Sequence, residues 1–157
     1  MKILMVCLGN ICRSPMAEGA LKSKLKEKNI EAEVDSAGFE PFHKGDPPDP
    51  RAVETLSKQG IDISGQRSRL FRVRDFDEFD KIFVMDSINH ADVMALARND
   101  TDMEKVDYIL NQVFPGEDRE VPDPYHGGPD GFNKVWELLD KATGNIADAI
   151  HRKNLSS

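Results

Sequence analysis

The N-terminal stretch of the chain constrains the fold more strongly than any other part of the sequence. Residues 3–6 form an apolar run with the length and composition of a buried strand. Residues 7–13 follow as a tight segment, and Ser14 and Pro15 suit the N-cap and the first position of a helix. Apolar residues then recur at helical spacing as far as Leu25. The sequence therefore predicts a strand, a short loop and a helix in direct succession.

The loop of residues 7–13, hereafter the 7–13 loop, has the residues of an anion site. A strand-to-helix loop points successive backbone N–H groups inward and ends at the positive terminus of a helix. Gly9 permits the tight turn, and Asn10 tolerates left-handed dihedrals. The planar fork of Arg13 can bind two phosphate oxygens. We expect this field to favour the thiolate of Cys7, which would then be a nucleophile beneath a bound phosphoryl group.

A buried cysteine in the first turn of an ordinary Rossmann-like fold is the simpler interpretation of the same stretch. That interpretation does not account for Arg13, and the loop lacks the G-x-G-x-x-G pattern of dinucleotide-binding turns. The spacing Cys7-x5-Arg13 followed by Ser14 is the signature loop of protein tyrosine phosphatases. The longer string VCLGNICRSPMAE, placed at the N-terminus, resembles the low-molecular-weight protein tyrosine phosphatase family, and in particular its bacterial members.

The resemblance extends along nearly the whole chain. Further matching strings, in the expected order, are DSA at 35–37, PPDPRA at 47–52, GIDISG at 60–65, VMD at 84–86 and DPY at 123–125. The resemblance implies that Cys7 is the nucleophile that carries a phosphocysteine intermediate and that Arg13 clamps the phosphate. It also implies phosphate binding by the rest of the loop, namely Leu8, Gly9, Asn10, Ile11, Cys12 and Ser14.

Asp123 is the candidate general acid and base. It lies in the string VPDPYH, where the two flanking prolines stiffen the backbone, as suits a positioned catalyst. A turn aspartate that caps local amides explains the same residues equally well. The resemblance decides between these interpretations, because the family carries its acid in an Asp-Pro-Tyr string. It also implies that Tyr125 forms a wall of the substrate cleft.

Three positions depart from the family pattern. Gln66 replaces a common histidine, Phe42 stands where Trp or Tyr is frequent, and His126 replaces a second tyrosine. We expect Phe42, Tyr125 and His126 to line the cleft. The residues expected to support the loop through hydrogen bonds are Asn10, Ser14, Ser36 and Gln66.

Cys12 has three interpretations: a small buried residue, a redox partner of Cys7, or a metal ligand. A single C-x4-C pair and four scattered histidines make a poor metal site, so no metal or other cofactor is expected. The resemblance favours a redox partner that protects Cys7 through a disulfide.

The order of the other predicted elements indicates the architecture. Strands are expected near 32–36, 81–86 and 106–110. Helices are expected to begin at Asp49-Pro50, immediately after Ser87 as an N-cap, and at Asp130. Alternating strands and helices predict a single Rossmann-like α/β domain over residues 1–157. Its four-stranded parallel sheet would have the order 2-1-3-4, with helices on both faces. The two long loops, 37–50 and 111–128, would then lie at the same sheet edge as Cys7.

Composition narrows the function further. The chain has 157 residues, of which 39% are hydrophobic and 31% charged, as is ordinary for a globular protein. The net charge of −7 counts against nucleic-acid binding. No apolar run is long enough to cross a membrane, and no signal peptide is evident. Two cysteines and no export signal indicate a reducing cytoplasm, and a monomer is the default expectation for the oligomeric state. A second basic cluster is interpreted as a solvated surface: Arg67, Arg69, Arg72 and Arg74.

The predicted function is hydrolysis of phosphotyrosine in proteins, with inorganic phosphate as product. The resemblance to bacterial members of the family implies a bacterial tyrosine kinase as one candidate substrate. Ile11 resembles the tyrosine branch of the family, whereas the arginine-phosphatase branch has Thr there. The alternatives are an arsenate reductase, a phosphocysteine phosphocarrier and a phosphotyrosine-binding module. An arsenate reductase would need further cysteines after Cys12, and the sequence has none. A phosphocarrier would lack Arg13 and Asp123, and a pure binding module would not need the intact Cys7.

Overall fold

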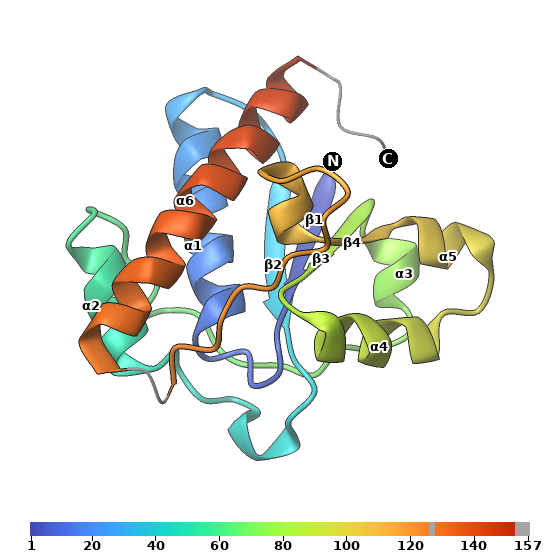
Figure 1. Ribbon diagram of the computed structural model, residues 1–157, viewed down its shortest axis with the longest axis horizontal. Helices are drawn as coiled ribbons and strands as arrows, with labels where there is room; N and C mark the ends of the chain where they lie inside the picture. Colours follow the sequence, from blue (N-terminus) through green and yellow to red (C-terminus); the bar gives the residue numbers. More distant parts are fainter. Residues whose placement is uncertain (126–127, 153–157) are drawn as a thin grey trace.

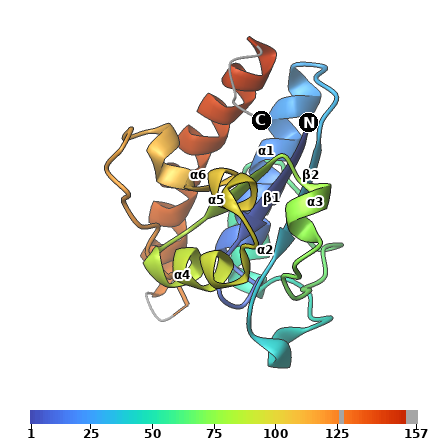
Figure 2. The same cartoon turned by 90° about the vertical axis from the view of Figure 1, so that its right-hand side faces the viewer.

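The computed structural model describes residues 1–125 and 128–152, and it contains a parallel sheet between two helical layers (Figures 1 and 2). The strands are β1 (Lys2–Val6), β2 (Glu33–Ala37), β3 (Lys81–Val84) and β4 (Val106–Tyr108). They form one four-stranded sheet in the order β2-β1-β3-β4, and every pairing is parallel. The predicted α/β architecture and strand order are confirmed.

The helices divide between the two faces of the sheet (Figure 1). One layer contains α1 (Arg13–Glu27), α2 (Pro50–Ser57) and α6 (Gly128–His151), and the other contains α3 (Asp75–Glu78), α4 (Ser87–Leu96) and α5 (Asp100–Glu104). Two short 3-10 helices, η1 (Pro41–His43) and η2 (Ile109–Gln112), lie within the long loops. Across residues 1–125 and 128–152, no helix combines the length and apolarity needed to cross a bilayer.

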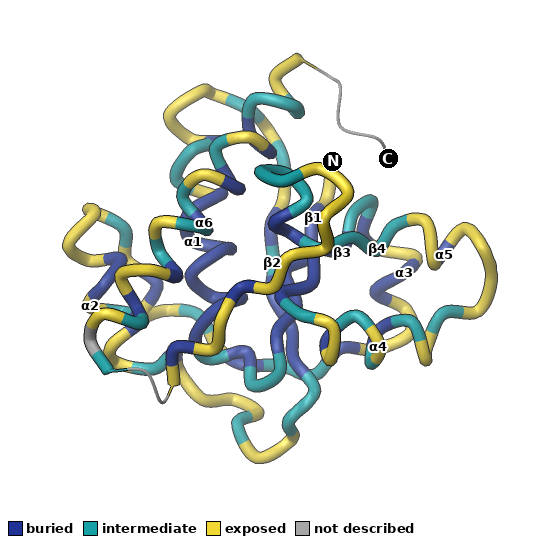
Figure 3. The backbone as a smooth tube through the Cα atoms, viewed as in Figure 1, coloured by how far each residue is buried: buried dark blue, intermediate teal, exposed yellow. Residues whose placement is uncertain are grey.

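Strand β1 is apolar along its length because both of its faces are covered. Ile3 and Met5 pack with α1 and α6, whereas Leu4 and Val6 pack on the opposite face, and all four side chains are fully buried. Figure 3 shows the central strands as the most deeply buried part of the chain. A continuous apolar run is what a strand covered on both faces requires.

The sheet register brings the candidate site to one edge. Val6 pairs with Ala37 on β2 and with Val84 on β3, so these three strands end side by side. The amide of Val121 donates to the carbonyl of Met85 at 2.8 Å, which returns the segment after η2 to the same edge. Both long loops therefore lie where parallel sheets of this topology bind ligands.

Three predicted helix starts are wrong by one or two residues. Helix α6 begins at Gly128, two residues before the expected Asp130. The other two errors have one reason in common. Helix α1 begins at Arg13 with Cys12 as its N-cap, because the Ser14 hydroxyl bonds to Cys7 and Asn10 and caps no backbone group. The N-cap of α4 is Asp86, whose carboxylate accepts from the Asn89 amide at 2.8 Å. Ser14 and Ser87 have good capping propensity, but their side chains are used for other contacts. The short helix α5 was not predicted.

The interpretation of the second basic cluster as a solvated surface is wrong for Arg69. Its guanidinium binds the carboxylates of Asp75, which is fully buried, and Asp35. Burial opposes the charge of Arg69, but the two carboxylates outweigh burial and raise its pKa. Arg69 therefore ties β2 to α3 and is part of the structure behind the 7–13 loop.

Gly38 lies so close to the backbone of the 7–13 loop that a larger residue at this position should destabilise the fold. A Cβ added at Gly38 would lie 2.8 Å from the Leu8 carbonyl oxygen and 2.9 Å from the Asn10 amide nitrogen, both of which are backbone atoms. We expect Gly38→Ala to reduce the free energy of unfolding by about 1–3 kcal/mol, since the backbone cannot retreat easily. Gly65→Ala is the matched control, because nothing lies within 4 Å of its Cβ position. Urea denaturation measures the free energy of unfolding of both variants. An equal decrease in the two variants would contradict this packing interpretation.

Candidate active site

The 7–13 loop turns its carbonyl groups outward. Carbonyls of the loop accept hydrogen bonds from the surrounding shell: Leu8 from Phe39 N at 2.7 Å, Gly9 from Ser68 Oγ at 3.2 Å, and Ile11 from Asp49 N at 2.8 Å. Within the described part of the chain, the N–H groups of residues 9–12 donate to no protein group. Asn10 adopts a left-handed φ of 56°, which the tight turn requires. The loop is thus a ring of available donors at the N-terminus of α1, and such a ring binds anions.

The side chain of Asn10 holds the loop from behind. Its Nδ2 atom donates to Ser14 Oγ at 2.8 Å and to Ser36 Oγ at 2.9 Å, and its Oδ1 atom accepts from the Arg69 amide at 3.0 Å. The Ser36 hydroxyl in turn donates to Glu18 Oε1 at 2.6 Å. All the side-chain groups of this network are buried or half-buried, so each hydrogen bond restricts the loop to one conformation.

These hydrogen bonds also fix the direction of the Ser14 proton. Ser14 Oγ accepts from Asn10 and lies 3.0 Å from Cys7 Sγ, so in the thiolate form of Cys7, which can only accept, the Ser14 hydroxyl donates to the sulfur. The backbone amide of Ser14 donates to the same sulfur at 3.4 Å. Two donors therefore converge on a buried sulfur, and this arrangement stabilises a negative charge there.

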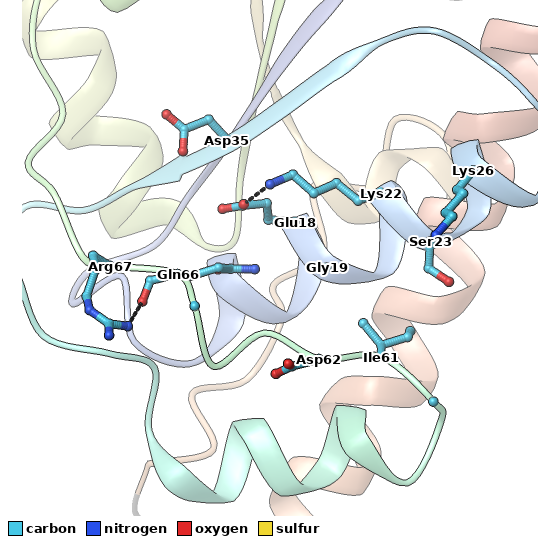
Figure 4. A pocket seen from close by; sticks show the side chains of 12 residues that line it. Glu18, Gly19, Lys22, Ser23, Lys26, Asp35, Ile61, Asp62, Gln66 and Arg67 are labelled. Carbon is cyan, nitrogen blue, oxygen red and sulfur yellow. Dashed lines mark hydrogen bonds and ion pairs between the residues drawn. The ribbon is translucent and has the colours of Figure 1, made fainter.

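Glu18, on α1, is the last residue of this network, and it also lines a pocket of about 560 Å³ (Figure 4). Its carboxylate is only 4% exposed and pairs with Lys22 Nζ at 2.6 Å. Gln66 lies beside it but does not join the asparagine network. Its Nε2 atom donates to the Pro15 carbonyl at 3.2 Å, and its buried Oε1 atom has no partner among the described residues. Gln66 therefore supports the loop through the first turn of α1 and not through Asn10.

Arg13 is buried beside Cys7 and is anchored by one nitrogen. Its Nη1 atom donates to Asp86 Oδ2 at 2.8 Å and to the Val121 carbonyl at 2.9 Å. Burial alone would lower the pKa of Arg13, but its electrostatic interaction with Cys7 and its hydrogen bond to Asp86 raise it above its usual value. In the described part of the chain, Nε and Nη2 have no partner, which leaves two parallel donors on a permanently charged group.

Most of the predicted site residues line one cavity of about 380 Å³. Of the residues predicted to bind phosphate, Asn10 and Ser14 do not line it and instead hydrogen-bond to each other behind the loop. The floor of the cavity is the 7–13 loop, and its walls and rim contain Glu40, Phe42, His43, Asp123 and Tyr125. Phe42 is 73% exposed and Tyr125 is 41% exposed, whereas Cys7 is buried at the base. The Asp123 carboxylate accepts from the Tyr125 amide at 3.0 Å. The predicted third wall residue, His126, lies outside the described residues.

Several residues of the site have no assigned role in the sequence analysis. Asp86 anchors Arg13, Glu18 ends the asparagine network, and Asp49 holds the Ile11 carbonyl. Asn89 is fully buried, and in the amide orientation that satisfies both neighbours it donates to Asp86 and accepts from the Leu8 amide at 3.3 Å. The strings VMD and PPDPRA contain two of these residues, but their partners are distant in sequence.

A family model for low molecular weight phosphotyrosine protein phosphatase matches residues 2–156. The chain belongs to this family of hydrolases. A protein of Synechocystis sp. that bears the family name is 42% identical over 155 residues, which cover 98% of each chain. The Schizosaccharomyces pombe low molecular weight phosphotyrosine protein phosphatase is 39% identical over 152 residues, covering 95% of this chain and 96% of the relative.

Solved structures of the family agree with the architecture. The Entamoeba histolytica protein tyrosine phosphatase with Hepes in its active site superposes with a TM-score of 0.91 at 33% identity, covering 99% of each chain. YfkJ from Bacillus subtilis superposes with a TM-score of 0.90 at 32% identity, covering 99% of this chain and 97% of that structure.

The buried network yields a stability prediction. Replacing Ser36 with Ala removes the donor to Glu18 and one acceptor of Asn10, and neither group can reach water easily. We expect Ser36→Ala to lower the free energy of unfolding by about 1–3 kcal/mol. Ser57→Ala, at an exposed serine on α2, should change it by less than about 0.5 kcal/mol. Equal urea midpoints for the two variants would contradict a role for this network in stability.

Proposed function

We propose that the protein hydrolyses phosphotyrosine in protein substrates through a phosphocysteine intermediate on Cys7. The observation that carries this proposal is the ring of N–H donors above a buried cysteine, with Arg13 beside it. A phosphoryl group placed in this ring would have its oxygens bound by the loop amides and by Nε and Nη2 of Arg13. Its phosphorus atom would then face Cys7 Sγ.

The first step transfers the phosphoryl group to sulfur. The Cys7 thiolate attacks phosphorus, an S–P bond forms, and the P–O bond to the tyrosine breaks. Asp123, which lines the same cavity, gives its proton to the departing phenolate oxygen. The loop amides and Arg13 stabilise the charge on the equatorial oxygens, and they are already oriented before the substrate binds.

The second step releases inorganic phosphate. The Asp123 carboxylate now accepts a proton from a water molecule, whose oxygen attacks phosphorus while the S–P bond breaks. The electron pair returns to Cys7 Sγ, where the Ser14 hydroxyl and amide donate to the developing thiolate. The same residues serve both steps, and the chemistry requires no cofactor.

The shape of the cavity favours an aryl phosphate. The exposed rings of Phe42 and Tyr125 stand at the rim, while the sulfur lies at the base. A phosphoserine side chain is too short to span this depth, whereas a phosphotyrosine ring can lie between the aromatic walls. Wzb of Vibrio vulnificus, which is 27% identical with a TM-score of 0.82, has been solved in complex with benzylphosphonate, an aromatic phosphonate.

The proposal also covers the physiological substrates and the state of the protein. We propose tyrosine-phosphorylated proteins as substrates, with a bacterial tyrosine kinase as one candidate, for a cytoplasmic monomer of a single domain. Ile11 favours phosphotyrosine over phosphoarginine, and faster turnover of a phosphoarginine peptide would reverse that assignment. A phosphocarrier or an arsenate reductase is less well supported, because Arg13 and Asp123 line the cavity and Cys12 is the second of only two cysteines.

Substitution of the two reacting groups tests the proposal. We expect Cys7→Ser to abolish hydrolysis of p-nitrophenyl phosphate, because no thiolate remains. Asp123→Ala should reduce kcat/KM for phenyl phosphate by about 10²–10⁴-fold, the usual contribution of a general acid. Its effect on p-nitrophenyl phosphate should be much smaller, since nitrophenolate leaves without a proton. Steady-state kinetics under reducing conditions measure both variants.

The control is Asp62→Ala, which removes an exposed carboxylate outside the cavity. An active Cys7→Ser variant would contradict the phosphocysteine intermediate. An inactive wild type would instead leave the loop as an anion-binding or phosphocarrier site.

We further propose that Cys12 protects Cys7 from overoxidation. Both thiols are free and buried, and burial raises the pKa of Cys12, so it remains a thiol while Cys7 reacts. The Cys7 thiolate would reduce a peroxide to its alcohol or water and become a sulfenic acid. Condensation with the Cys12 thiol would then release water and form a disulfide.

After peroxide treatment, the wild type should recover activity when dithiothreitol is added, whereas Cys12→Ser should recover much less. Mass spectrometry should detect a Cys7–Cys12 crosslink before reduction. Equal recovery of both proteins, without a crosslink, would remove this role from Cys12.

A further inference from the structure

Arg51, in the first turn of α2, connects the two sides of the cavity mouth. Its guanidinium forms a bidentate pair with Asp49, with Nε to Oδ1 at 3.1 Å and Nη2 to Oδ2 at 3.0 Å. Its third donor, Nη1, reaches the Tyr125 carbonyl at 2.9 Å. One planar group therefore bonds to two segments that are more than 70 residues apart in the chain.

Aromatic rings hold the same guanidinium in place. Its central carbon lies 5.2 Å from the centre of the Tyr125 ring and 4.8 Å from the centre of the buried Phe132 ring. Both distances fall within the range of cation–π attraction. The hydrogen bonds and the rings together leave the plane of Arg51 little freedom to rotate.

Each partner of Arg51 is bound in turn to a group of the proposed reaction. The Asp49 amide donates to the Ile11 carbonyl at 2.8 Å, which ties Arg51 to the 7–13 loop. The Tyr125 amide donates to Asp123 Oδ1 at 3.0 Å, which ties Arg51 to the carboxylate of the candidate acid. A continuous path of hydrogen bonds thus runs from the phosphate-binding loop to Asp123.

We propose that Arg51 is a positioning residue that sets the distance between Asp123 and a phosphoryl group held in the 7–13 loop. This inference rests on the proposed function, since it takes Asp123 as the general acid. Arg51 does not line the cavity and touches no reacting atom, so it acts through Tyr125 and Asp123.

A lysine could not replace this arrangement. Its single ammonium group has no planar fork to bind both oxygens of Asp49 while it also donates to Tyr125. The contribution of Arg51 to stability should nevertheless be small, because its side chain is 44% exposed and exposed ion pairs contribute little. A loss of activity without a loss of stability is therefore the signature of a positioning role.

The leaving-group dependence of kcat/KM tests the proposal. Aryl phosphates with increasingly basic leaving groups, from p-nitrophenyl to phenyl phosphate, are compared for the wild type, Arg51→Met, Arg51→Lys and Asp123→Ala. We expect Arg51→Met and Arg51→Lys to lose about tenfold or more on phenyl phosphate and less than about threefold on p-nitrophenyl phosphate, since only the poor leaving group needs a positioned proton. Thermal unfolding midpoints confirm that each variant is folded.

A double variant separates this role from a general loss of structure. If Arg51 acts only through Asp123, adding Arg51→Met to Asp123→Ala should reduce kcat/KM for phenyl phosphate no further. The matched control is Arg119→Met: Arg119 also pairs with a carboxylate two residues earlier, Glu117, and stacks on an aromatic ring, that of Phe114. We expect this control to leave the leaving-group dependence unchanged.

Failure of the positioning role and failure of the proposed general acid give different results. An equal loss on every aryl phosphate in both Arg51 variants, or an additive loss in the double variant, would contradict the positioning role alone. If Asp123→Ala itself shows no increased dependence on the leaving group, the proposed acid is wrong whatever the Arg51 variants do.

Discussion

The buried hydrogen bonds of Asn10 are the constraint on which the rest of the site depends. They hold a residue with φ of 56° inside a loop whose N–H groups have no protein acceptor among the described residues. Without these bonds the loop could turn its amides toward competing acceptors and lose the anion site. The same side chain directs the Ser14 proton toward Cys7. The same hydrogen bonds therefore set the conformation of the loop and stabilise a negative charge on the sulfur.

The base of the cavity is electropositive, although the molecule as a whole is negatively charged. The chain carries a net charge of −7, yet the base of the cavity presents the loop amides, the N-terminus of α1 and the charged Arg13. Asp86 binds only Nη1 of Arg13, so Nε and Nη2 remain available to an anion. Donors oriented in advance in a buried site stabilise a transferring phosphoryl group more strongly than water does. An acidic protein can thus process an anionic substrate at one sheet edge.

Long-range contacts explain which parts of the site could not be predicted. Arg13 and Asp86 are 73 residues apart, and Arg51 and Tyr125 are 74 apart. Local propensity also fails at Ser14 and Ser87, whose good capping side chains do not cap their helices because tertiary contacts bind the first and Asp86 replaces the second. Arg69 is similar: its sequence context is a charged stretch, but the fold pairs it with a fully buried aspartate. No periodicity or spacing contains these pairings.

The sequence by itself determined the alternating α/β order and the 7–13 loop between a buried strand and a helix, because these depend on local patterns of apolar and turn residues. The strand order could also be predicted, because right-handed crossovers allow few topologies for alternating strands and helices. The sequence also identified the family, since the motif strings lie in order along the chain. Only the tertiary structure decided which groups hold those motifs in place: Asp86 on Arg13, Glu18 behind Ser36, and Arg51 between the two loops. The physical reason is that a side chain's partner depends on strand register and helix packing, which bring distant residues to one edge of the sheet.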